Sequence, residues 1–252
     1  MWAGAAGARP HDSEQRVHTG MEQIWNGLVE ALRLLFGGDG SVFEIALRSL
    51  WISGLALLIA MVIGVPLGVL IALKRFPMRR AMAASVNTGM AAPPVVVGLL
   101  VWLLLTRNGP LGEYRLLLTP TAMVIAQVFI ALPMVIGLVM ASVLQVELGM
   151  LQQIAALGAG RVQSFVLLLR EIRIGVLAAI MAAFGAVISE VGAVMIVGGN
   201  IKGQTQVLTT AIVQETRMGK TATAIALSII LMALAFGANY ALTILQQRGQ
   251  RG

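Results

Sequence analysis

The chain has 252 residues, of which 58% are hydrophobic and only 12% charged, and its formal net charge is +7. A soluble domain would carry about 25% charged residues, and membrane proteins place Lys and Arg at the ends of their spans, so the positive charge does not call for a nucleic-acid partner. The absence of cysteine excludes disulfides, thiolate metal sites and thiol chemistry. We therefore expect an all-α protein embedded in the lipid bilayer, with no catalytic residue, metal or cofactor.

The first 45 residues are expected to lie outside the spans. Residues 1–20 are polar and lack the apolar core of a signal peptide, so we interpret them as a disordered or artefactual tail. The segment 21–45 contains a stretch, 22–36, with apolar side chains on one side of a helix and charged ones on the other. This pattern predicts an amphipathic helix at the membrane interface, followed by a glycine-rich linker.

Five later stretches are long and apolar enough to cross the bilayer, because about 20 helical residues span its hydrocarbon core. Four of them contain no Asp, Glu, Lys or Arg, and the fifth contains only Glu190. They predict a transmembrane domain over 46–246, followed by a short basic tail at 247–252. The stretches are 49–73, 81–106, 116–146, 174–201 and 221–246.

Proline and charge add detail to these spans. Pro93 and Pro94 remove helical hydrogen bonds and should kink or interrupt the second span. With five spans, the loops 74–80 and 144–173 share a side with the C-terminus and carry nine Lys and Arg together with the tail, against five in the other loops. Because basic residues favour the cytoplasmic side, we expect the N-terminus outside the cell membrane and the C-terminus in the cytoplasm.

The longest internal segment of mixed polarity is 147–173. Its sequence predicts a helix over about 150–157, a turn at Gly158 and Gly160, and a second helix from Val162 onward. Such a helix–turn–helix can present a short apolar knob to a groove on a partner protein. On pattern alone, an ordinary turn between two spans explains the segment equally well.

This segment resembles the "EAA" coupling loop of ABC importer permeases, in which Glu-Ala-Ala is followed, after three residues, by Gly. The resemblance implies contact with an ABC ATPase subunit. The family's Glu is replaced, and its later Leu-Pro reads Leu169-Arg170 here. The Ala-Ala, the Gly, the small residue after it and the Arg match the family. The residues that the resemblance assigns to the ATPase-coupling loop are Gln153, Ala155, Ala156, Leu157, Gly158, Ala159 and Arg161.

Other motifs narrow the family. The segments 92–100, 107–112 and 189–200 resemble the molybdate and tungstate permeases, and 119–127 and 206–216 look closest to the tungstate-specific permease. The resemblance implies a type I ABC importer permease (MetI-like) fold and a homodimer. It also implies an extracytoplasmic oxyanion-binding protein, a separate ATPase subunit, and import of tungstate or molybdate, with no chemistry performed by this chain.

Glu190 is the only ionisable side chain well inside an expected span. A carboxylate in lipid is costly, so it should face protein or water. It either lines the translocation pathway, where its charge would repel an oxyanion unless it is protonated or bound to a cation, or it packs against backbone or Gln127 at a dimer interface. Other residues that we assign to the pathway or to packing are Pro93, Pro94 and Asn200.

Two other functions compete with an importer subunit. An intramembrane enzyme would need a nucleophile or a metal cluster within the spans, and the only histidines, His11 and His18, lie in the tail. An ion-coupled secondary transporter could use Glu190 as its coupling group, and interrupted helices suit such folds. A carrier of that kind would need neither a coupling loop nor an ATPase.

Overall fold

The computed structural model of this protein describes residues 22, 25–30, 32–33, 40–74, 76–147, 149, 156, 158 and 160–250. In this part of the chain, all regular secondary structure is helical, as the composition predicts. The elements are α2 (Gly40–Leu73), α3 (Arg79–Met90), α4 (Pro94–Leu105), the 3-10 helix η1 (Gly112–Tyr114), α5 (Pro120–Leu144), α7 (Arg161–Glu171), α8 (Arg173–Ile188), α9 (Gly192–Gly198), α10 (Leu208–Arg217) and α11 (Thr221–Gln250).

Three helices are long and apolar enough to cross a membrane on their own, namely α2, α5 and the part of α11 over Thr221–Ile244. Two pairs qualify only when they are joined across a bend: α3 with α4, at 107°, and α7 with α8, at 71°. By length and composition the described chain therefore has three to five spans. The uncharged stretches at 49–73, 116–146 and 221–246 correspond to α2, α5 and α11.

Two of the expected spans are broken. At 81–106 the break is the one that proline predicts, because Pro93 has an extended backbone before α4 and Pro94 occupies its first turn. The stretch 174–201 is also interrupted, because α8 ends at Ile188 and α9 begins at Gly192.

The ends of the chain are described in part. Helix α2 begins at Gly40, before the expected start of the transmembrane domain at position 46. Residues 25–30 are helical, as the amphipathic pattern predicts. Gly27 lies against α11, because a Cβ built on it would clash with Cγ2 of Ile225. The expected tail at 1–20 and the final residues 251–252 lie outside the described residues. The interfacial position of the amphipathic helix stays a prediction.

The centre of the bundle is the contact between α2 and α5. A Cβ on Gly68 would lie 2.9 Å from the backbone oxygen of Ile136, and one on Gly64 would lie 2.9 Å from Cγ1 of Val135. Small residues allow this approach, which matters in a membrane because lipid gives helices no hydrophobic drive to associate. Val135 and Val139 are fully buried where the two helices meet.

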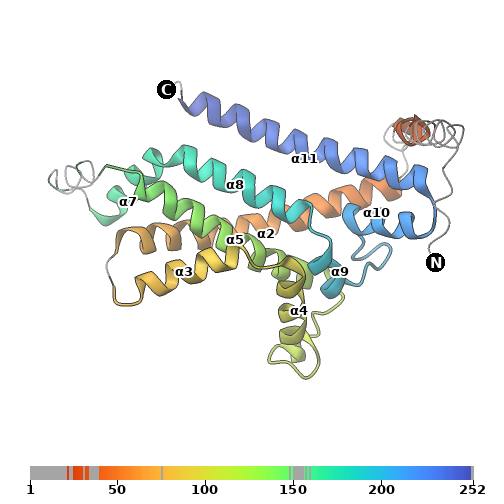
Figure 1. The fold of residues 1–252 in the computed structure, drawn as a ribbon, viewed down its shortest axis with the longest axis horizontal. Helices are drawn as coiled ribbons and strands as arrows, with labels where there is room; N and C mark the ends of the chain where they lie inside the picture. Colours follow the sequence, from red (N-terminus) through yellow and green to blue (C-terminus); the bar gives the residue numbers. More distant parts are fainter. Residues whose placement is uncertain are drawn as a thin grey trace, which may run out of the picture.

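Helices α2, α5, α8 and α11 run along the long axis of the molecule, and α4 projects sideways from them (Figure 1). The α2–α3 loop, α7 and the C-terminal end of α11 lie toward one end, which we call the α7 end. The first residues of α2 and α11 lie with α10 toward the opposite end, the α10 end (Figure 1). The structure thus places the described parts of the loop 74–80, helix α7 and the C-terminal end of α11 toward the same end.

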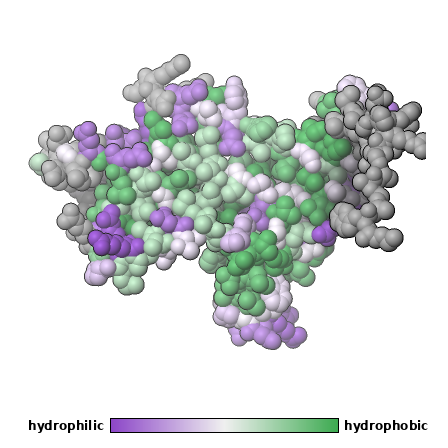
Figure 2. Space-filling view, viewed as in Figure 1, coloured by the Kyte–Doolittle hydropathy of each residue, from purple (hydrophilic) through white to green (hydrophobic). Residues whose placement is uncertain are grey.

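The surface of the bundle is largely apolar. Figure 2 shows hydrophobic residues along the bundle and over the projecting α4, with hydrophilic residues at the tip beyond α4. Side chains such as Val62 and Phe236 are about two-thirds exposed, at 67% and 66%. Exposed apolar surface of this extent is expected where helices contact lipid or another membrane subunit.

Candidate functional site

The break between α8 and α9 holds Glu190. Its backbone N–H donates to the Val187 oxygen at 3.3 Å, and its Oε1 accepts the N–H of Ala193 at 2.9 Å. The carboxylate therefore caps the first turn of α9, where backbone amides lack helical partners. Glu190 therefore lies between α8 and α9 rather than inside a helix. Its carboxylate hydrogen-bonds to the backbone and not to Gln127, which is one of the two packing arrangements that the sequence leaves open.

Gln127 reaches the same region from α5. Its Nε2 donates to the backbone oxygen of Val187 at 3.0 Å, so the amide holds the last turn of α8 rather than the Glu190 carboxylate. The side chain is buried, with 3% of its surface exposed, and its Oε1 has no hydrogen-bond partner among the described residues. A buried amide oxygen without a partner is costly and rare in native structures, so this atom points to a ligand or water.

A small cavity brings these two side chains together. Its volume is about 10 Å³, close to the room needed by one water molecule. A cavity of this volume does not admit a hydrated oxyanion. The lining residues come from α2, α5, the α8–α9 break and α10, and are Ser49, Ile52, Ser53, Gln127, Ile188, Glu190, Val207 and Thr209.

Hydroxyl groups fasten α10 to this cavity. Thr209 donates to the backbone oxygen of Glu190 at 3.0 Å. Ser49 donates to the oxygen of Ile45 at 2.8 Å and accepts the N–H of Leu208, also at 2.8 Å. The start of α10 is therefore tied both to α2 and to the α8–α9 break.

Pro93 and Pro94 act at a distance from the cavity by directing α4 onto α9. A Cβ on Gly98 would lie 2.5 Å from Cα of Ala193, so the backbones of α4 and α9 nearly touch. The prolines thus shape the packing beside Glu190, and neither of them lines the cavity.

Asn200 belongs to a separate network at the α10 end. It adopts a left-handed backbone (φ 53°), and its Nδ2 donates to Oε1 of Gln214 at 2.7 Å. Gln206 donates to the same oxygen at 2.8 Å, and Thr205 donates to the Gly198 oxygen at 2.6 Å. These bonds make 198–207 a tightly bonded connector. Asn200 does not join Gln127 and Glu190.

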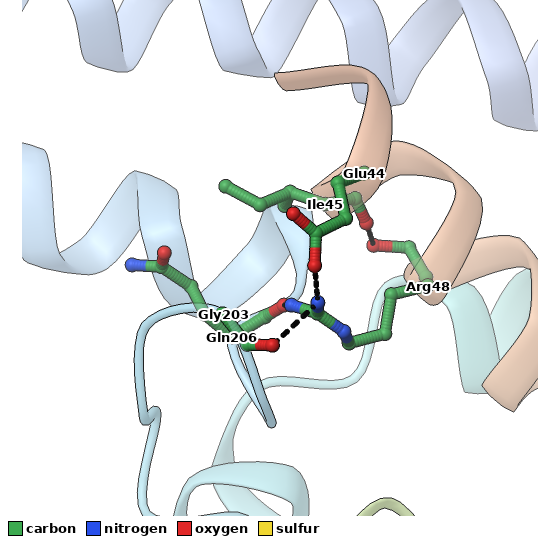
Figure 3. Close-up of polar contacts among 6 residues, drawn as sticks. Glu44, Ile45, Arg48, Gly203 and Gln206 are labelled. Carbon is green, nitrogen blue, oxygen red and sulfur yellow. Dashed lines mark hydrogen bonds and ion pairs between the residues drawn. The ribbon is translucent and has the colours of Figure 1, made fainter. Parts of the chain in front are cut away.

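Arg48 is a structural residue that sequence reasoning did not assign. It lies on α2, donates to the backbone oxygens of Gly203 at 2.9 Å and Gln206 at 3.0 Å, and forms an ion pair with Glu44 (Figure 3). Only 12% of its side chain is exposed. The guanidinium thus holds the 198–207 connector against α2. The only sequence signal was an Arg four residues after a Glu at the start of an apolar run.

Replacing Arg48 by Met should destabilise the protein, because two carbonyl oxygens lose a charged donor. Hydrogen bonds to charged groups contribute about 1.5–3 kcal/mol, so we expect a clearly lower thermal unfolding midpoint in detergent. Arg217→Met is the matched control, since Arg217 is exposed at the end of α10 with no side-chain bond in the described structure. Equal midpoints for the two variants would contradict the role of Arg48.

The expected coupling loop is described in part. Gln153, Ala155, Leu157 and Ala159 lie outside the described residues, whereas Ala156 is helical and Gly158 is in a turn, both exposed. Gly158 has a φ of +75°, a conformation that favours glycine. Helix α7 then begins at Arg161, and the Gly160 N–H donates to Oε1 of Gln163 at 3.0 Å. The turn and the second helix are thus where the sequence predicts them.

Comparison with known proteins identifies the architecture. Residues 64–251 match the family model described as "Binding-protein-dependent transport system inner membrane component". The chain belongs to this family. It is similar to "Tungstate uptake system permease protein TupB" of Peptoclostridium acidaminophilum, with 39% identity covering 90% of this chain and all of that protein. It is also similar to "Probable anion ABC transporter permease protein" of Haloferax volcanii, with 40% identity over 76% of this chain and 84% of the relative.

A solved structure of the MetNI methionine ABC transporter in inward-facing conformations has the same fold. The TM-score is 0.70 with 19% identity, and the match covers 85% of this chain and 98% of that one. The MetI-like fold expected for the permease is therefore confirmed. The permease is a multi-pass membrane protein and a transport component, not a catalytic subunit.

Proposed function

We propose that this permease is the membrane-spanning subunit of an ATP-driven importer that carries tungstate, or the related oxyanion molybdate, into the cytoplasm. The observation that carries the proposal is the 39% identity to a tungstate uptake permease over 90% of this chain. An extracytoplasmic binding protein would deliver the oxyanion, in keeping with the family's description. A separate ABC ATPase subunit would supply the energy.

Two copies of the permease would enclose one pathway. In favour of a homodimer, the cavity beside Glu190 has room for about one water molecule, at about 10 Å³, so a single chain offers no route there. Helix α4 also projects from the bundle with exposed apolar residues, among them Leu99, Leu100 and Leu103. A second copy packed beside α4 would cover part of this surface.

The ATPase would bind the loop around 153–161. The exposed turn at Gly158 comes shortly before α7 in the sequence, and α7 lies at the α7 end together with the α2–α3 loop and the C-terminal end of α11. We assign this end to the cytoplasm, with the N-terminus outside, because basic loops favour the cytoplasmic side. ATP binding would then move α7 and α8 as a unit and open the pathway to the other side.

Uptake by reconstituted vesicles tests the proposal. The permease, an ATPase subunit and a binding protein would be assembled in vesicles, and tungstate, molybdate and sulfate would be offered in turn. We expect ATP-dependent uptake of tungstate, competition by molybdate and little uptake of sulfate. Uptake that needs no ATP and follows an ion gradient would instead support the secondary transporter, which has no other support here.

A further inference from the structure

We propose that the cavity between Gln127 and Glu190 binds one small monovalent cation, of which sodium is the best fit. This site goes beyond the proposed transport function and does not rest on it. The starting observation is the buried amide oxygen of Gln127, a residue that lines the cavity, because this oxygen has no hydrogen-bond partner in the part of the chain that the structure describes. An acceptor in that position requires either a donor or a cation.

The chemistry of the lining favours a cation. Gln127 offers Oε1, Glu190 its carboxylate, and Ser53 and Thr209 their hydroxyl oxygens. Oε1 of Glu190 accepts the Ala193 amide, while Oε2 receives no hydrogen bond from the described residues. No Lys, Arg or His is among the lining residues. Oxygen ligands without thiolate or imidazole are the set that hard cations prefer.

Charge and size select among hard cations. The lining holds one carboxylate, and the described residues contain no group of three His, Cys, Asp or Glu that could hold a metal ion. One negative charge is balanced by one monovalent ion, whereas Ca²⁺ sites usually recruit several carboxylates. The volume of about 10 Å³ admits a single water-sized particle. A water molecule would fit as well, but it would bring no positive charge to the carboxylate of Glu190, which the Ala193 amide satisfies only at Oε1.

A bound cation would have a definite structural role. Gln127 belongs to α5, Ser53 to α2, Glu190 to the α8–α9 break and Thr209 to α10. An ion at their meeting point would join these four parts.

Thermal unfolding of the full chain in lipid nanodiscs tests the site. Protein prepared in choline chloride would be titrated with NaCl at constant ionic strength, because only a ligand of the folded state raises the midpoint saturably. We expect a rise of about 3 °C in the wild type. Glu190→Gln and Gln127→Leu should remove the response to sodium.

Thr205→Val is the matched control. Thr205 is fully buried and hydrogen-bonded in the connector but does not line the cavity, so this variant should be less stable and yet keep the sodium response. A wild-type midpoint that does not change with sodium would mean that water fills the cavity, and it would overturn the proposal. A response that survives in Glu190→Gln would overturn it too. Neither result depends on whether the permease carries tungstate.

Discussion

Replacing Gly98 by alanine should leave little folded or active permease. A Cβ at this position would lie 2.5 Å from Cα and 2.8 Å from Cβ of Ala193, where α4 crosses α9. Because one clashing atom belongs to the backbone, no side-chain rotation relieves the contact. Overpacking a well-packed core costs about 1–3 kcal/mol, and here the two helices would also have to separate beside Glu190. The measurements are the yield of monodisperse protein and tungstate uptake.

Gly54→Ala provides the control for this prediction. Gly54 is also in a membrane-spanning helix, α2, but a Cβ on it would meet nothing within 4 Å. This variant should fold and transport like the wild type, since alanine is the better helix former. Adding Ala193→Gly to Gly98→Ala removes one of the two clashing atoms and should restore part of the yield. If Gly98→Ala alone behaved like Gly54→Ala, the close packing of α4 on α9 would be contradicted.

The main spans could be predicted because hydrophobic length alone determines them. The stretches at 49–73, 116–146 and 221–246 have few alternatives to a membrane helix once charge is absent. The break at 81–106 was also readable, since Pro93 and Pro94 cannot continue a helix. The break at Ser189–Val191 carries no proline. Its only local signal is the polar Ser189-Glu190 pair, and the bonds that stabilise it come from Ala193, nearby, and from Thr209 on another helix.

The sequence identifies single polar residues of the site, but not which of them the fold brings together. Glu190 and Gln127 stand out as polar groups in apolar stretches, and the structure brings both to one cavity. That Ser53 lines the same cavity depends on how α2 packs on α5, which no local pattern encodes. Arg48 illustrates the same limit, because its partner Gly203 is 155 positions away. Asn200, which we assigned to the pathway or to packing, belongs to the separate network with Gln214.

Replacing Gly158 by valine should uncouple ATP hydrolysis from uptake. Gly158 has a φ of +75°, and a Cβ on it would meet no described residue within 4 Å, so among the described residues backbone strain is the obstacle to a side chain. Holding an L-residue in the left-handed region costs roughly 1–2 kcal/mol, and a β-branched one is a genuine outlier there. The backbone at position 158 would move out of the left-handed region, and the chain before α7 would change direction. We expect the amount of tungstate imported per ATP hydrolysed to fall about tenfold, because a free-energy cost of about 1.4 kcal/mol corresponds to a factor of ten.

Two further variants separate backbone conformation from side-chain size at this turn. Gly158→Asn should retain most of the coupling, because asparagine tolerates the left-handed region. Gly160→Ala should be neutral, since Gly160 has a φ of −65° and its Cβ would meet only Oε1 of Gln163, at 3.9 Å. For each variant, the amount of tungstate imported per ATP hydrolysed would be measured in vesicles that contain the ATPase and the binding protein. Full coupling in Gly158→Val would mean that the ATPase does not depend on this turn, and the loop at 153–161 would lose its assigned role.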